Sequence, residues 1–166
     1  LSMFNFDKMI DSFTEIISDL LMLLLLAMIM MIFISVICRF FFNVNFVALQ
    51  ELIMYFHATI FMLGISYALK KDAHVKIDVI YNILPKKIKI YMSMASILLF
   101  ILPTAIFLIY ISIGMTIQSW SIFEGSSEAG GLNLVFILKT IIPLTGILIL
   151  LQSMSQLLKI LKSMER

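Results

Sequence analysis

Four long stretches of this chain contain no Asp, Glu, Lys or Arg, and this feature constrains the fold more than any motif. About 20 apolar residues suffice for a helix to cross a bilayer, because the hydrocarbon core is about 30 Å thick and a helix rises about 1.5 Å per residue. A helix on the surface of a water-soluble domain keeps one polar face in water. The uncharged stretches have no charged face, and they cover residues 20–38, 52–69, 90–123 and 140–158.

The composition supports the same interpretation. Hydrophobic residues make up 62% of the chain, charged residues 13%, and the mean hydropathy is +1.11, which is unusual for a globular domain in water. We therefore predict an all-α membrane protein that forms one integral-membrane domain over residues 1–166. We expect the first apolar stretch to be retained rather than cleaved as a signal peptide, because acidic residues dominate the segment before it. The four expected spans cover approximately residues 18–41, 50–70, 90–118 and 136–159.

The basic residues predict how the chain is oriented. Ten of the twelve Lys and Arg residues lie before the first span, between the second and third spans, or after the fourth. Loops that carry an excess of Lys and Arg stay on the cytoplasmic side of the membrane. Both termini and the second connection are therefore expected in the cytoplasm, and an even number of spans is required for this arrangement.

Two segments outside the spans have an apolar stripe at helical spacing. Residues 5–20 have an apolar stripe at helical spacing with Asp7, Lys8, Asp11 and Glu15 on the opposite face, so we expect a helix that lies along the membrane interface and then turns into the first span. Residues 75–84 predict a second interfacial helix in the cytoplasmic connection, ended by Pro85. The lysines near this connection either bind lipid headgroups or only set the topology of the chain. The candidates for headgroup binding are Lys70, Lys71, Lys86, Lys87 and Lys89.

The third and fourth apolar stretches contain the prolines that can disturb a helix. The third is longer than the bilayer requires, so its helix tilts or projects, and Pro103 is a candidate kink. Trp120 is expected at the outer interface, where indole rings favour the headgroup zone. Pro143 is harmless if the last helix begins near it, whereas a start near Leu134 predicts a kink.

Polar residues inside the spans are few, and each has a structural explanation. Arg39 and Glu51 are read as anchors of helix ends, with a functional ion pair as the alternative. His57 lacks an intramembrane carboxylate and is read as a packing residue. Gly64 and Ala68 are spaced for close approach of another helix, on a stripe of the second span that we expect to face protein.

No motif of this sequence indicates catalysis or a cofactor. His74 and Asp78 are one turn apart and, with Asp72, make at most three metal ligands, so we expect no metal site there. The sequence has no phosphate-binding loop, no nucleophile elbow and no paired catalytic carboxylates. We therefore expect neither an enzyme nor a nucleic-acid-binding protein.

Several of these residues, taken in order, resemble a known family. The pattern is an acidic residue at the start of the second span, a glycine within it, and a basic, His and Asp motif at its exit. It is similar to the DctQ-like small membrane subunit, or Q component, of tripartite ATP-independent periplasmic (TRAP) transporters. Lys139 and Asp72 depart from the usual pattern. The matching positions are Glu51, Gly64, Lys70-Lys71, His74, Asp78, Leu84-Pro85, Trp120 and Pro143 to Gly146.

The resemblance implies a role in a three-protein complex of the bacterial inner membrane. In this family a periplasmic binding protein delivers an organic anion, such as a C4-dicarboxylate or sialic acid, to a large elevator-type membrane subunit that is coupled to sodium. The small subunit then scaffolds the large one and binds neither substrate nor sodium. The candidates for partner contact or helix anchoring are Arg39, Glu51, His57, Gly64, Ala68, His74, Asp78 and Trp120.

Two alternatives remain open from the residues alone. The chain could be an accessory or assembly subunit of another bacterial inner-membrane complex. It could also be a small dimeric exporter, which requires a membrane carboxylate, and Glu51 is the residue available for that role.

Overall fold

The computed structural model describes residues 3–71 and 85–164, and every element in these ranges is helical. Four helical stretches are long and apolar enough to cross a membrane, namely Asp7–Phe42, Val47–Lys70, Ile88–Ser121 and Val135–Lys162. The predicted all-α class, with four helices long and apolar enough to span a membrane, is thus confirmed in the described residues. The predicted interfacial helix at 75–84 lies outside the described residues, as do His74 and Asp78. The elements are α1 (Met3–Phe42), α2 (Val47–Lys70), α4 (Lys86–Ser96), the π-helical η1 (Ile97–Ile101), α5 (Leu102–Ser121) and α6 (Val135–Met164).

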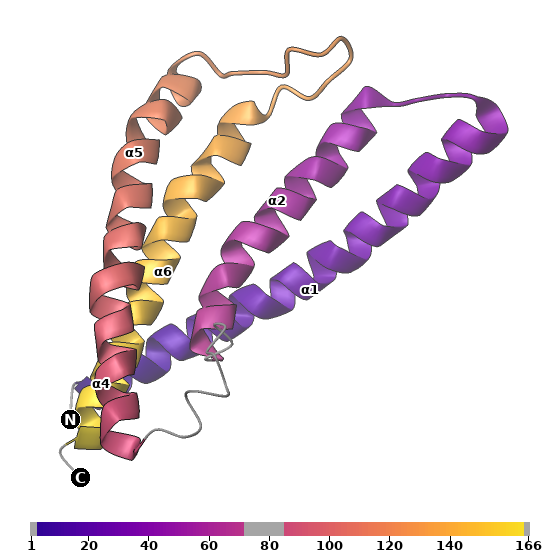
Figure 1. Ribbon diagram of the computed structural model, residues 1–166. Coiled ribbons are helices and arrows are strands. Elements are labelled where there is room, and N and C mark those ends of the chain that lie inside the picture. The colour runs from indigo at the N-terminus through magenta and orange to yellow at the C-terminus, as the bar shows by residue number, and fades with distance from the viewer. Residues whose placement is uncertain (1–2, 72–84, 165–166) are drawn as a thin grey trace.

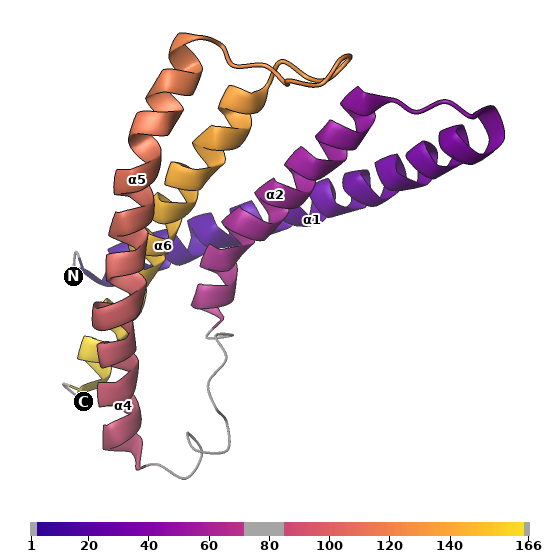
Figure 2. The same ribbon diagram turned by 45° about the horizontal axis from the view of Figure 1, so that its top comes forward.

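The helices form two antiparallel pairs that converge at one end of the molecule (Figures 1 and 2). One pair is α1 with α2, and the other is α5 with α6. The start of α1 and the end of α6 lie together at the convergent end, which we call the terminal end (Figure 1). Toward the opposite end, the loop end, the two pairs separate. The side of the membrane on which the terminal end lies stays a prediction.

The first helix differs from the sequence-based expectation. We expected an interfacial helix, then a turn, then the first span, but α1 is one continuous helix of 40 residues. A straight helix of this length extends about 60 Å, roughly twice the thickness of the hydrocarbon core. No Pro or Gly interrupts α1, so nothing in its sequence forces a turn. Placement of its amino-terminal part along the interface stays a prediction.

The closest packing lies between α5 and α6. Ala105 of α5 is fully buried and, together with Leu69 of α2 and Ile149 of α6, forms the hydrophobic core. Gly146 permits this contact, because a Cβ atom there would lie 2.7 Å from Ile109 Cγ1 and 3.1 Å from the carbonyl oxygen of Ala105. Most other large apolar side chains of the described residues are exposed on the surface of the bundle. This distribution is expected where lipid, rather than water, surrounds the helices.

Pro103 is accommodated by a change of helix type. The π-helical segment η1 ends two residues before Pro103, which is the second residue of α5. Proline lacks a backbone N–H, and its ring crowds the carbonyl four residues earlier. A π-helical turn widens the backbone at that point. The sequence indicated a candidate kink at Pro103, and the structure has a π-helical segment directly before α5 at this place.

Pro143 lies inside α6, because this helix begins at Val135. The missing N–H of Pro143 leaves the carbonyl of Lys139 without its usual helical donor. The Thr116 hydroxyl of α5 shares its single proton between that carbonyl oxygen, at 3.3 Å, and the carbonyl oxygen of Ser112, at 2.9 Å. A neighbouring helix therefore supplies the donor that the proline removed, which is how proline is tolerated in membrane helices.

The close approach at Gly146 generates a testable expectation. Gly146→Ala places a Cβ against the backbone of α5, which cannot move aside as a flexible side chain can. We expect the free energy of unfolding in detergent micelles to fall by about 1–3 kcal/mol, as for other overpacked sites. Gly114→Ala is the matched control, since a Cβ there has no atom within 4 Å. Equal stability of the two variants would contradict this account of the α5 and α6 contact.

Candidate functional site

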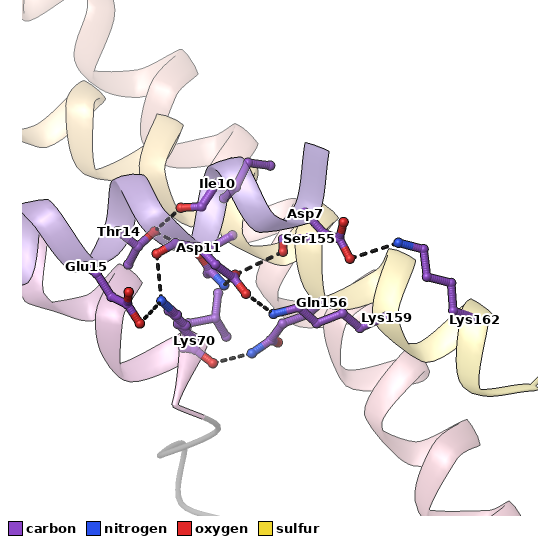
Figure 3. Close-up of polar contacts among 12 residues, drawn as sticks. Asp7, Ile10, Asp11, Thr14, Glu15, Lys70, Ser155, Gln156, Lys159 and Lys162 are labelled. Carbon is purple, nitrogen blue, oxygen red and sulfur yellow. Dashed lines mark hydrogen bonds and ion pairs between the residues drawn. The ribbon is translucent and has the colours of Figure 1, made fainter. Parts of the chain in front are cut away.

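The acidic residues of α1 bind lysines of α2 and α6 at the terminal end. Lys70 of α2 pairs with Glu15 at 2.7 Å and also donates a hydrogen bond to the carbonyl oxygen of Asp11 at 2.6 Å. Figure 3 shows how these side chains converge from three helices. We call this group the N-terminal polar cluster, and it consists of Asp7, Asp11, Thr14, Glu15, Lys70, Gln152, Ser155, Gln156, Lys159 and Lys162.

Asp11 is the carboxylate with the most partners in this cluster. It pairs with Lys159 and accepts hydrogen bonds from the Gln152 amide and the Ser155 hydroxyl, each at 3.2 Å. The Gln152 side chain is fully buried, and its carbonyl oxygen accepts a hydrogen bond from Thr14 at 2.9 Å. A buried amide without partners would be costly, so these contacts determine how α1 crosses α6.

Two further contacts extend the cluster at its edges. Lys162 pairs with Asp7 at 2.8 Å, and the Gln156 amide donates a hydrogen bond to the carbonyl oxygen of Leu69 near the end of α2. The Gln156 contact satisfies one of the carbonyls that a helix end leaves without an intrahelical donor. The cluster thus joins α1, α2 and α6 at the terminal end.

A second polar site, which we call the Glu51 loop contact, lies at the loop end. Glu51 is in the first two turns of α2, and its carboxylate accepts hydrogen bonds from the Ser126 hydroxyl and, at 2.6 Å, from the backbone N–H of Leu132. Both donors belong to the loop between α5 and α6, which extends toward the start of α2 (Figures 1 and 2). The contact therefore links the two helix pairs where they separate.

The loop is folded around this carboxylate. The backbone N–H of Ser126 donates to the carbonyl of Leu132 at 3.0 Å, and the N–H of Gly131 donates to the carbonyl of Glu128 at 3.0 Å. A Cβ atom at Gly131 would lie 2.4 Å from Ser126 Oγ and 2.8 Å from Glu51 Oε1. Glycine is needed at this position because any side chain would displace the carboxylate or the hydroxyl.

Near this loop, Trp120 and Glu124 hold the ends of α5 and α6 together. The Trp120 indole N–H donates to the Thr140 hydroxyl at 2.8 Å, and its ring packs on Phe136 with centroids 4.7 Å apart. Glu124 pairs with Lys139 of α6. The hydrogen bond from the Lys139 ammonium lowers the pKa of Glu124 below its ordinary value. Trp120 therefore has a structural role at this end, and its place at the membrane interface stays a prediction.

The structure does not bring Arg39 and Glu51 together as an ion pair, which was the alternative to their expected role as anchors of helix ends. Both Glu51 oxygens contact the loop, and Arg39 is exposed in the last turn of α1 without an ion pair in the described part of the chain. His57 is also exposed, on the same face of α2 as Met54 and Phe61. That face turns away from the other helices of this chain.

Gly64 does not bring two helices of this chain into close contact. A Cβ atom there would be 4.0 Å from its nearest neighbour, Leu21 Cδ1, and Ala68 is half-buried. Within the described residues, this pair is therefore not the site of a close helix contact.

The lysine candidates for headgroup binding are in different settings. The Lys70 ammonium is engaged by Glu15 and the Asp11 carbonyl, whereas the Lys71 ammonium lies over the Tyr67 ring, 5.5 Å from its centroid, and Lys71 is exposed. Lys89 is half-buried, and the side chains of Lys86 and Lys87 lie outside the described set. In the described ranges, no group of three or more His, Cys, Asp or Glu residues could hold a metal ion.

Sequence reasoning missed the pairing within the N-terminal polar cluster. The signal was present: Asp7, Asp11 and Glu15 recur every fourth residue, and Gln152, Ser155, Gln156 and Lys159 share one face of a helix. We interpreted this segment as a helix along the membrane interface, without a partner for its acidic face. Only the tertiary structure shows that the two faces meet.

The family model described as "Tripartite ATP-independent periplasmic transporters, DctQ component" matches residues 28–163. The match includes α2, α5 and nearly all of α6, with most of the uncharged part of α1. It excludes the four members of the N-terminal polar cluster that α1 contributes. No curated protein gives a significant match.

The N-terminal polar cluster predicts a measurable loss of stability. Asp11→Ala removes the acceptor for Gln152 and Ser155, so we expect the free energy of unfolding in detergent to fall by about 1–3 kcal/mol. Asp19→Ala is the matched control, because Asp19 is an exposed acid on the same helix, and it should stay within about 0.5 kcal/mol of the parent protein. Similar losses in both variants would show that the cluster does not join α1 to α6.

The Glu51 loop contact predicts an effect on hydrogen exchange. In Glu51→Ala the N–H of Leu132 loses its acceptor, so the amides of residues 124–134 should exchange with deuterium faster than in the parent protein. Gln50→Ala is the control, since the Gln50 amide bonds the Asn45 side chain rather than the loop. Unchanged exchange in Glu51→Ala would show that the carboxylate does not order the loop.

Proposed function

Because the chain belongs to the DctQ family of TRAP transporter components, we propose that it is the small membrane subunit and that it scaffolds the large one. The family consists of transporter components that work with a larger membrane subunit and a substrate-binding protein, so the chain is not an enzyme. Four helices that can span a bilayer make it a multi-pass membrane protein. The finer role has to be argued from the contacts described above.

The observation that carries the proposal is that polar side chains at both ends of the bundle bind other parts of the same chain. The carboxylates of Asp11 and Glu51 each accept hydrogen bonds from another segment of the bundle. A substrate or sodium site would need several oxygen ligands left available near the middle of the membrane. Between these two ends, the spans instead consist of long stretches without Asp, Glu, Lys or Arg. Such a bundle is suited to bracing a partner rather than carrying solute.

The exposed face of α2 is the surface that we assign to the large subunit. Met54 is 52% exposed and Phe61 is 68% exposed, with the imidazole of His57 between them. Ala68, which is half-buried, continues this face toward the terminal end, whereas Gly64 lies at its edge beside Leu21 of α1. A buried histidine at such an interface would need a hydrogen-bond partner, which the large subunit would supply.

The remaining parts of the proposal concern the complex. The chain is placed in the bacterial inner membrane with both termini in the cytoplasm, and the large subunit moves an organic anion by an elevator motion coupled to sodium. The scaffold must stay fixed while that motion occurs. The length of α1 and its ion pairs with α2 and α6 support this role. Arg39, His74 and Asp78 stay candidates for the same interface.

The alternative of a small exporter that uses Glu51 is less well supported. A proton-coupled exporter needs a carboxylate that is open to the transport path, whereas both oxygens of Glu51 accept hydrogen bonds from the loop. The alternative of an accessory subunit in an unrelated complex does not account for the family match over residues 28–163.

The proposal is tested by co-expression with the large subunit and binding protein encoded in the same genome. We expect Phe61→Ala to reduce co-purification of the large subunit, because it removes a large apolar side chain from the proposed interface. Phe100→Ala is the matched control, since Phe100 of η1 is 70% exposed and lies outside the α2 face.

Proteoliposomes provide the second measurement. Sodium-dependent uptake should require this chain together with its two partners, and the chain alone should accumulate no solute. Ion-coupled accumulation by the purified chain alone, or equal co-purification of Phe61→Ala and Phe100→Ala, would refute the scaffold assignment.

A further inference from the structure

A shallow hollow of about 170 Å³ lies between α1 and α2, on the surface of the described bundle. Its apolar part is lined by Leu21, Met22 and Leu25 of α1 and by Ile60 and Gly64 of α2. If a methylene group takes about as much space as a water molecule in the liquid, roughly 30 Å³, the hollow holds a short stretch of hydrocarbon chain.

The hollow has one polar end. Ser18 of α1 and Tyr67 of α2 line it at the end nearer the N-terminal polar cluster, because the two helices run antiparallel. Lys71 follows one turn after Tyr67, with its ammonium over the Tyr67 ring. Along a helix, Gly64 and Lys71 are separated by about 10 Å, since each residue adds about 1.5 Å. Polar and charged groups therefore lie at one end of the apolar hollow.

Glycine at position 64 is what leaves the hollow open. The nearest described atom to a Cβ built at Gly64 is Leu21 Cδ1 at 4.0 Å, so a side chain at this position would enter the hollow without meeting a close neighbour at its Cβ. An empty space beside a membrane helix forfeits dispersion contacts on one side. In a bilayer, the molecules available to restore those contacts are lipid chains or a side chain of another protein.

We propose that this hollow binds a membrane phospholipid, with one acyl chain along Gly64 and the phosphate at Lys71. Lipid tails are as apolar as leucine, so filling the hollow with hydrocarbon does not by itself select a particular molecule. The selection comes from the polar end, where a phosphate meets an exposed ammonium and the Ser18 side chain while its chain follows the apolar part.

The surrounding charges favour Lys71 over its neighbour for this contact. The Lys70 ammonium is held by Glu15, so their charges offset one another. Lys71 forms no ion pair within the described residues. Asp19, next to Ser18 in sequence, is exposed and opposes a headgroup of high negative charge. The site therefore suits the single charge of a phosphodiester.

The test uses the full chain in vesicles made from equal amounts of phosphatidylethanolamine and phosphatidylglycerol. A trace of phosphatidylglycerol with a photoreactive group in its acyl chain is added, the sample is irradiated, and labelled peptides are identified by mass spectrometry. We expect label to concentrate in residues 21–25 and 60–64, several-fold above the level in α5. A parallel sample contains photoreactive phosphatidylethanolamine instead. Labelling at the same residues in that sample would show that the phosphate group is sufficient for binding, whichever headgroup it carries.

Matched variants distinguish a binding site from general contact with the bilayer. Gly64→Leu fills the hollow and should abolish the concentrated label, whereas Gly114→Leu adds the same side chain in open space on α5 and should not. Lys71→Gln should lower labelling about fivefold, the factor that corresponds to ~1 kcal/mol for one lysine near a membrane surface, while Lys71→Arg should retain it. Lys71 is exposed, so its replacement tests the site even if Gly64→Leu does not fold.

Two results would overturn the proposal. One is equal labelling of all lipid-facing helices that Gly64→Leu and Lys71→Gln leave unchanged. The other is a combined result: the label is lost when the large subunit is co-expressed, and the Gly64→Leu variant co-purifies less of the large subunit than the parent protein does. The second result would make the hollow a contact between subunits, and it would leave the proposed scaffold function intact.

Discussion

The contact between Asp11 of α1 and the buried face of α6 controls how the two helix pairs are arranged. Gln152 is fully buried and can be satisfied only if Thr14 and Asp11 lie opposite it, since its amide has a donor and an acceptor to pair. Apolar packing in lipid gives little orientational preference, because a leucine finds similar surroundings against a helix or against lipid. Hydrogen bonds and ion pairs at the terminal end therefore select one crossing of α1 over α6.

The opposite end of the bundle uses a different solution to a related problem. There the helix pairs separate, and the carboxylate of Glu51 binds the loop that joins α5 to α6. Within that second pair, Gly146 permits close packing and Thr116 supplies the hydrogen bond that Pro143 cannot make. The result is a bundle whose helices are joined by hydrogen bonds and ion pairs at both ends and are mainly apolar between them. A subunit that must hold its shape while a partner moves needs this distribution of contacts.

Sequence reasoning was successful where a single residue or a local pattern carries the information. Uncharged stretches predicted four spans, and Pro103 marked the place where the third helix changes form. It was wrong about a turn within α1, and it did not find the contacts of Glu51, since a loop 75 residues away supplies the Ser126 donor. The pairing of Asp11 with Lys159 spans 148 residues, and periodicity along each helix cannot show which faces meet.

The sequence by itself determined that the chain forms apolar helices able to cross a bilayer, because length and hydropathy are properties of each segment alone. The order of Glu51, Gly64 and the Pro143 to Gly146 segment also carried a family resemblance that the family match over residues 28–163 confirms. Only the tertiary structure decided which charges are neutralised within the chain and which face of α2 remains available. Those outcomes depend on the relative rotation of helices, which is set by contacts between residues far apart in the chain.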